Sequence, residues 1–248
     1  MNVKNYLLAF LTLSLFLEIL LIPGLPAQAQ SELKNRSYTS QRIIFKEDFN
    51  PPGNGGPKDS TGAGSRDGQK CSQNEQQIQA LMPKRNYGLT LEERPSIFIN
   101  LRKTSAKQVV LAFQDETGKF YQRAVLPITT NAGIVDFSLP VEKEALVVGK
   151  NYQWSLIVVC GQSVQPDDPM LRGWVQRVAR TPQLERELRQ KSVIEQAMWY
   201  GESGYWYDML KVLAQARREH PDNNQLTSLW RDLLESVGLG AIASVPPK

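Results

Sequence analysis

Residues 151–160 read Asn-Tyr-Gln-Trp-Ser-Leu-Ile-Val-Val-Cys, and this stretch decides the fold. Large or apolar side chains stand at every second position, at Tyr152, Trp154, Leu156, Val158 and Cys160. Because side chains alternate between the two faces of a strand, all of them point to the same face. The stretch therefore predicts a β-strand with one face in a core.

Shorter runs with the same period lie on both sides of this stretch. Their residues are Ile97, Ile99 and Leu101; Val109, Leu111 and Phe113; Phe120 to Leu126; Val135, Phe137 and Leu139; and Trp174 to Val178. Turn residues separate them at 116–118, 131–133 and 167–169. Short alternating runs joined by turns are typical of an antiparallel β-sandwich. We therefore predict a sandwich of about seven strands over residues 71–180.

The approach to the central stretch carries a second signal, Leu146-x-x-Gly149-x-x-Tyr152-x-Trp154. It resembles the segment that enters strand F of immunoglobulin-like and fibronectin-type sandwiches, where a tyrosine hydroxyl bonds back to the preceding loop. The resemblance implies a tyrosine corner at Tyr152 and an immunoglobulin- or fibronectin-like sandwich.

After residue 180 the period becomes helical. Thr181 and Pro182 have the order of a cap and a first helical residue, and predict a helix to about Tyr200. Two more helices are predicted, from Trp206 to Pro221 and from an Asp222-x-x-Gln225 capping pattern to Gly238. Residues 181–240 are thus expected to form a cap of two to three helices on the sandwich or on a partner, followed by a tail, 241–248. A further capping pattern at Ser72 predicts a short helix through residue 81.

The first 29 residues have the three parts of a secretory signal peptide. Lys4 lies in a short head, residues 7–22 are almost wholly apolar, and Ala27-Gln28-Ala29 forms a small-residue cleavage site. The apolar run is shorter than the roughly 20 residues of a spanning helix. Cleavage after Ala29 and export to the periplasm or the extracellular space are therefore favoured over a retained anchor. No later run is long enough to span a bilayer.

Residues 30–70 have the composition of a flexible linker. They are rich in glycine, proline and polar residues, which cannot bury enough apolar surface to offset the entropy of ordering. The glycines do not match a phosphate-binding loop. Ile43, Ile44 and Phe45 form a short apolar patch that could pair as an edge strand.

The chain has two cysteines, Cys71 and Cys160. In an exported protein such a pair favours a disulfide, with two buried thiols as the alternative. The bridge would close a loop of about 90 residues and contribute about 4–5 kcal/mol in the chain-entropy description.

Residues suited to catalysis are scarce. His220 is the only histidine, and its place at a helix end suits a capping role. With one histidine and two cysteines expected to pair, zinc sites and Ser-His or Cys-His catalysis are disfavoured. Asp167 and Asp168 could help to bind calcium, but they are more typical of a loop. We expect no catalytic, metal-binding or cofactor-binding residue, and we expect Glu92 and Glu93 to be solvated surface.

An aromatic cluster marks the corner between two predicted helices. It consists of Trp199, Tyr200, Tyr205, Trp206 and Tyr207. These rings could form a binding platform for a sugar or a peptide. They could equally seal the corner against the sandwich, and burial is the commoner role of aromatic side chains.

Several motifs together resemble one family. They are Leu81-Met82-Pro83, Gly88-Leu89-Thr90-Leu91-x-x-Arg94-Pro95, Gly133-Ile134-Val135, Leu139-Pro140, Leu146-x-x-Gly149-x-x-Tyr152-x-Trp154, Cys160, Gly173-Trp174-Val175-Gln176-Arg177 and Trp206-Tyr207-Asp208. The combination resembles the cyanobacterial domain-of-unknown-function family numbered 928 over roughly residues 55 to 240. The resemblance implies an exported protein and implies no reaction.

The sequence favours an exported, non-catalytic envelope protein that binds another protein or a surface polymer. A net charge of +4 leaves no strong nucleic-acid footprint. A carbohydrate-binding module that uses the aromatic cluster and a carboxylate-only enzyme are the alternatives. No cofactor is expected.

Overall fold

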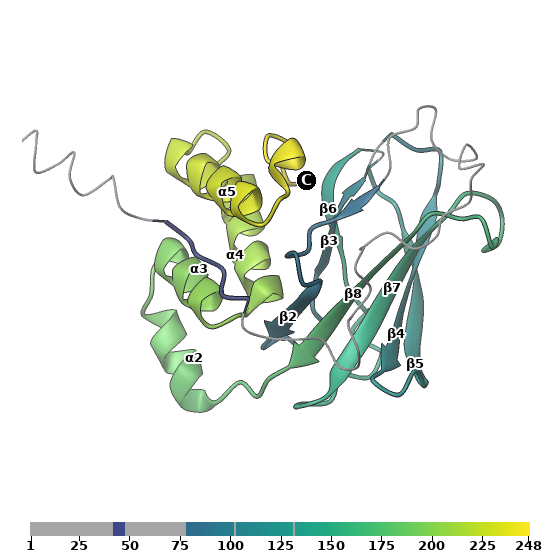
Figure 1. Ribbon diagram of the computed structural model, residues 1–248, viewed down its shortest axis with the longest axis horizontal. Helices are drawn as coiled ribbons and strands as arrows, with labels where there is room; N and C mark the ends of the chain where they lie inside the picture. Colours follow the sequence, from purple (N-terminus) through teal and green to yellow (C-terminus); the bar gives the residue numbers. More distant parts are fainter. Residues whose placement is uncertain (1–41, 48–77, 102, 131) are drawn as a thin grey trace, which may run out of the picture. The chain divides into compact units, whose positions relative to one another are not determined.

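The computed structural model describes residues 42–47, 78–101, 103–130 and 132–248. The predicted signal peptide 1–29, most of the predicted linker 30–70, and Cys71 lie outside these ranges. Within them the chain forms eight strands in two sheets, followed by four α-helices (Figure 1). The prediction of a mainly β chain with helices at its C-terminal end is confirmed.

The larger sheet has the strand order β2-β8-β7-β4-β5. Its strands are β2 (Tyr87–Thr90), β4 (Gln108–Asp115), β5 (Phe120–Pro127), β7 (Asn151–Val159) and β8 (Met170–Arg177). β4, β5, β7 and β8 pair antiparallel, as predicted. Along β7, the four alternate side chains from Tyr152 to Val158 are each at most 2 % exposed. The period-two pattern therefore identified the buried face correctly.

β2 departs from the expected antiparallel pairing. It runs parallel to β8, with Tyr87 beside Trp174. All four residues of β2 are buried, the polar Thr90 included, so its two faces do not differ in exposure. Gly88 lies against helix α4 (Trp206–Glu219), and a Cβ added there would lie 2.5 Å from the Cβ of Trp206. Glycine thus permits the close approach of strand and helix.

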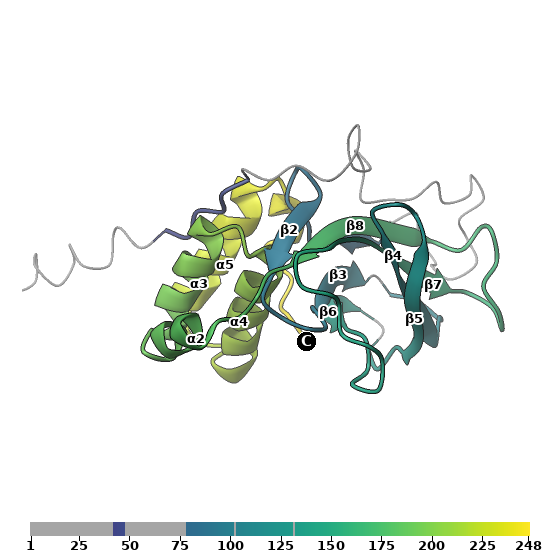
Figure 2. The ribbon, with the colours of Figure 1, turned by 90° about the horizontal axis from the view of Figure 1, so that it is seen from below.

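The smaller sheet is antiparallel, with the order β1-β3-β6. Its strands are β1 (Gln79–Ala80), β3 (Ile97–Leu101) and β6 (Gly133–Phe137). It lies on the inner side of the curve of the larger sheet (Figure 2). The helix predicted to continue through residue 81 is wrong at its end, since Gln79 and Ala80 pair with Asn100 and Ile99. Strand pairing and burial of Ala80 outweigh the local capping pattern there.

Four helices follow the sheets, where two to three were predicted. They are α2 (Pro182–Arg189), α3 (Val193–Glu202), α4 and α5 (Asn224–Ser236). The single helix expected up to Tyr200 is two, because Ser192 begins a new helix with a reciprocal capping box to Glu195. Thr181 caps α2 as predicted, whereas α5 is capped by Asn223, next to the expected Asp222.

Helix α4 packs against the sheets through its first turn. The Trp206 indole N–H donates to the Leu81 carbonyl at 2.8 Å. The Tyr207 hydroxyl accepts from the Trp154 indole N–H at 2.7 Å and donates to the Trp174 carbonyl at 2.8 Å. These bonds satisfy buried polar groups that would otherwise cost free energy. They fix the helices to the sheets of the same chain.

Both ends of the described chain are attached to this core. Ile43 is buried, and the backbone N–H of Lys46 donates to the Gly201 carbonyl at 3.0 Å. Residues 43–45 therefore lie against the α3–α4 corner and not, as suggested, in an edge strand. At the other end Ile242 is buried, and the Lys248 N–H donates to the Ile134 carbonyl of β6 at 2.8 Å.

Candidate binding face

The predicted aromatic cluster lies at the corner where α3 meets α4. Tyr200, Tyr205, Trp206 and Tyr207 are buried, and Trp199 is half-buried. The rings of Trp199 and Tyr205 stack at 5.4 Å between centroids. Burial raises the pKa of Tyr200 to about 12. Four of the five rings thus fill the corner, and a platform at this place would depend on the remaining face of Trp199.

Asp208, in the first turn of α4, was named in the sequence analysis only as part of the motif Trp206-Tyr207-Asp208 and was given no role there. It is 3 % exposed, and both carboxylate oxygens accept from the Leu91 N–H, at 3.1 and 3.3 Å. Arg180 approaches to 4.0 Å. Burial is the main cause that raises the pKa of this carboxyl to about 7, and the Glu92 carboxylate adds to it. The contact joins the end of β2 to α4.

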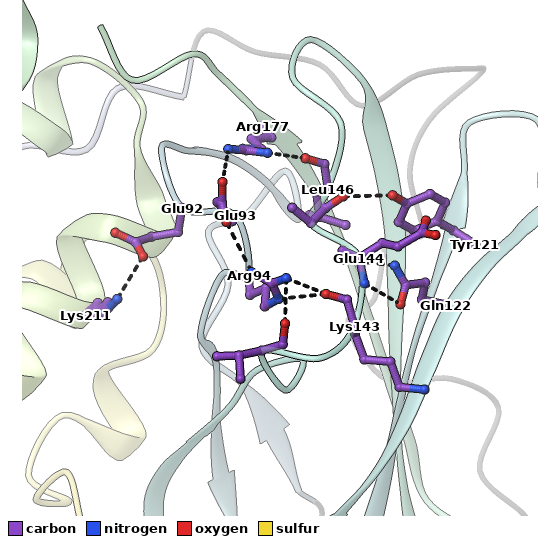
Figure 3. A network of polar contacts seen from close by, with 12 residues as sticks. Glu92, Glu93, Arg94, Tyr121, Gln122, Lys143, Glu144, Leu146, Arg177 and Lys211 are labelled. Carbon is purple, nitrogen blue, oxygen red and sulfur yellow. Dashed lines mark hydrogen bonds and ion pairs between the residues drawn. The ribbon is translucent and has the colours of Figure 1, made fainter. Parts of the chain in front are cut away.

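The charged residues after β2 form two groups of ion pairs, one around Glu92 and one around Glu93 (Figure 3). Glu92 pairs with Arg180 at 2.9 Å and with Lys211 of α4 at 3.0 Å. Glu93 pairs with Arg94 at 3.2 Å and with Arg177 at 3.0 Å. The expectation of solvated surface is therefore wrong for Glu92, which is half-buried and joins α4 to the sheet edge.

The loop between β6 and β7 is held against β5 and β7. The Tyr152 hydroxyl accepts from the Val147 N–H at 3.2 Å, which is the bond expected of a tyrosine corner. Tyr121 of β5 donates to the Ala145 carbonyl at 2.8 Å. The Gln122 amide both donates to and accepts from the backbone of Glu144 (Figure 3). These side-chain bonds attach the loop to β5 and β7.

The outer face of the larger sheet is the side of β4, β5, β7 and β8 that points away from the smaller sheet. The strand register places alternate residues of these strands in rows that cross the sheet. One row is apolar and consists of Val125, Val110, Ile157 and Met170. Val125 is 59 % exposed and the other three are half-buried. The helices lie beside β2, and the smaller sheet lies on the opposite side of the larger sheet (Figures 1 and 2).

A second row lies two residues along the strands. It consists of Arg123, Ala112, Ser155 and Arg172. A third row, beyond it, consists of Phe120, Gln114, Gln153 and Trp174. The outer face therefore has an apolar side, a middle row with an arginine at each end, and a side that carries amides, the exposed ring of Phe120 and the ring of Trp174, which is only 8 % exposed.

A cavity of about 340 Å³ lies at the β8 end of the apolar row. Its walls come from two members of the row and from the β7–β8 loop: Ile157, Val164, Gln165, Pro166, Asp168 and Met170. Asp168 is buried and accepts from the N–H groups of Cys160, at 3.2 Å, and Gln165, at 2.8 Å. The loop is thus braced from inside. A smaller cavity of about 260 Å³ lies between β5 and β6.

The other residues that the sequence analysis considered for a site make contacts within their own loop or helix. Asp168 braces its loop, as expected of a loop residue, and the described residues contain no cluster of three or more metal-ligating side chains. His220 is exposed at the end of α4, where its backbone N–H donates to the Ala216 carbonyl. No free cysteine occurs in the described part of the chain. Because Cys71 lies outside that part, its pairing with Cys160 stays a prediction.

Sequence reasoning did not find the outer face. Its rows draw one residue from each of four strands, so no local pattern marks them.

In the part of the chain that the structure describes, no helix is long and apolar enough to cross a membrane. No curated protein matches this sequence. A family model matches residues 61–247, which is most of the chain. The chain therefore belongs to the family described as Domain of Unknown Function (DUF928).

Proposed function

We propose that this chain is an exported, non-catalytic module that binds another protein through the outer face of its larger sheet. The observation that carries the proposal is the apolar row, which runs from Val125 to the cavity under the β7–β8 loop. Exposed apolar surface with a polar rim is typical of protein interaction sites. A cavity at one end of the row offers a place for an anchoring side chain of the partner.

The export and non-catalytic parts of this proposal have separate supports. Export is supported by the three-part pattern of residues 1–29. A non-catalytic role is supported by the single histidine and by the structural contacts of Asp168 and Asp208. No observation favours carbohydrate binding by residues 199–207, because four of the five rings are buried.

We also propose that the two sheets form a variant of the immunoglobulin-like sandwich. The support is the Tyr152 hydroxyl, which accepts from the Val147 N–H five residues upstream. The parallel strand β2 distinguishes this variant from a wholly antiparallel sandwich.

The Cys71–Cys160 disulfide is part of the same proposal. Cys160 directly follows β7, and its N–H is held by Asp168, so a bridge there would anchor residue 71 at the base of the loop that walls the cavity. We expect that the non-reduced, denatured protein gains no mass on alkylation, and that it gains two adducts after reduction. Mass spectrometry makes the measurement. Two adducts without reduction would show free thiols and refute the bridge.

The interaction face is tested by placing a charge in the apolar row. Val125→Asp adds a carboxylate where a partner would have to desolvate it, and we expect the yield of cross-linked partner to fall about tenfold. The measurement is cross-linking of the tagged full chain in its native envelope fraction, with quantification by mass spectrometry.

The matched control is Val141→Asp. Val141 is 85 % exposed on the β6–β7 loop, away from the rows of the outer face, and this change should leave the yield unaltered. Thermal unfolding of both variants verifies that they are folded. Equal yields from wild type, Val125→Asp and Val141→Asp would contradict the assignment of this face.

A further inference from the structure

The middle row of the outer face has a distinctive composition. Arg123 of β5 and Arg172 of β8 stand at its two ends, and the small residues Ala112 and Ser155 lie between them. Three strand spacings of about 4.8 Å separate the two arginine Cα atoms by roughly 14 Å. Two long side chains at this separation can converge over the small residues. The row is therefore a shallow trough with a guanidinium at each end.

Neither guanidinium group pairs with another group in the part of the chain that the structure describes. Among the described residues, no hydrogen bond or ion pair is formed by the side chain of Arg123 or Arg172, whereas Arg94, Arg177 and Arg180 all pair with carboxylates. The three rows of the outer face also contain no acidic residue. Since arginine stays protonated, this part of the face carries two positive charges that nothing in the rows neutralises.

The apolar row lies only two residues away along each strand. Two residues of a strand rise about 7 Å, so Arg123 is that far from Val125, and Arg172 from Met170. A partner that covers both rows must present apolar groups and anionic groups side by side. A second copy of this chain, docked with its middle row on this one, would place arginine against arginine, which is unfavourable.

From this arrangement we infer that the partner is a polypeptide segment that carries aspartate or glutamate beside apolar side chains. Its carboxylates meet Arg123 and Arg172, and its apolar side chains cover the Val125–Met170 row, with one in the cavity beside Ile157 and Val164. Arginine binds carboxylates in a bidentate geometry, which orients the segment as well as attracting it. A carboxylated polysaccharide would satisfy the arginines but leave the apolar row and the cavity unfilled. This inference rests on the proposed function and specifies its partner.

The test uses a displayed library of random 16-residue peptides selected on the purified full chain. We expect the enriched peptides to contain acidic residues next to apolar ones. Their affinity should fall about tenfold in the double variant R123E/R172E and should weaken as salt rises, because interface charges act through screened attraction. On the double variant itself, selection should instead enrich lysine and arginine.

The control variant is Arg186→Glu. Arg186 is exposed on α2 and lies outside the outer face, so this change alters the net charge without touching the rows. We expect it to leave the affinity unchanged. Thermal unfolding confirms that the charge variants are folded.

The other possible outcomes show whether the acidic partner alone is refuted or the proposed function as well. Peptides whose binding is abolished by Ile157→Asp, but which show no acidic enrichment and no response to R123E/R172E, overturn the acidic partner and leave protein binding in place. Binding of alginate that requires both arginines, without peptide binding, overturns the polypeptide partner. Binding of neither probe to the face overturns both proposals.

Discussion

The carboxyl of Asp208 shows how a single residue can join two parts of the molecule. It belongs to the first turn of α4, yet its hydrogen bonds go to Leu91, at the end of β2. Nothing in the sequence around Trp206-Tyr207-Asp208 indicates burial of the aspartate. Tyr152 is the opposite case, because its spacing from Gly149 predicts the bond to the preceding loop. A contact within one loop can be read from spacing, whereas a contact across 117 residues cannot.

Stability should therefore depend on pH through Asp208. Its pKa is raised from 3.8 to about 7 in the folded state, mainly by burial. Between these two values unfolding releases a proton, so the contribution of protonated Asp208 to stability is fully present below about pH 4 and is lost as pH rises towards 7. A shift of this size corresponds to roughly 4 kcal/mol. Urea denaturation between pH 4.5 and 8 should show this fall in the wild type.

Asp208→Asn is the matched variant, since its amide oxygen can still accept from the Leu91 N–H but does not titrate. We expect its stability to change less with pH across the same range, so that the wild type loses stability relative to Asp208→Asn as pH rises. Parallel stability curves for wild type and Asp208→Asn would show that this carboxyl does not titrate in that window.

At the scale of elements, the strands that were predicted are those whose large apolar residues recur at every second position. β4 and β7 alternate between buried and half-exposed residues along nearly their whole length. β1 and β2 were not predicted, because β1 has two residues and β2 has only four, one of them a glycine. The break between α2 and α3 was missed although its signal was present, since Ser192 and Glu195 have capping-box spacing.

The packing of β2 on α4 can be tested at Gly88. In Gly88→Ala the new methyl would meet the Cβ of Trp206 at 2.5 Å, so strand and helix must move apart. We expect a loss of about 1–3 kcal/mol in the free energy of unfolding, as for other overpacked sites. Gly161→Ala is the control, because its nearest neighbour would be the Ser163 carbonyl oxygen at 3.9 Å. Equal midpoints in urea denaturation for the two variants would contradict this close contact.

At the scale of the whole molecule, the fold class was accessible from the sequence and the candidate face was not. The rows of the outer face depend on register, and register is set by how β5, β4, β7 and β8 align across the sheet. The same alignment places Arg123 and Arg172 in one row, although they are 49 residues apart in the sequence. The period of residues 151–160 identifies which side chains face outward, but their neighbours come from other strands.

The alternation along β7 also bears on how such a protein can diversify. Tyr152, Trp154 and Leu156 fill the core, while Gln153, Ser155 and Ile157 face outward, so the two sets occupy separate positions of one short strand. A substitution at an outward position alters the surface and leaves the core packing untouched. Variants of this scaffold could therefore acquire new partners one surface position at a time, without first passing through a destabilised fold.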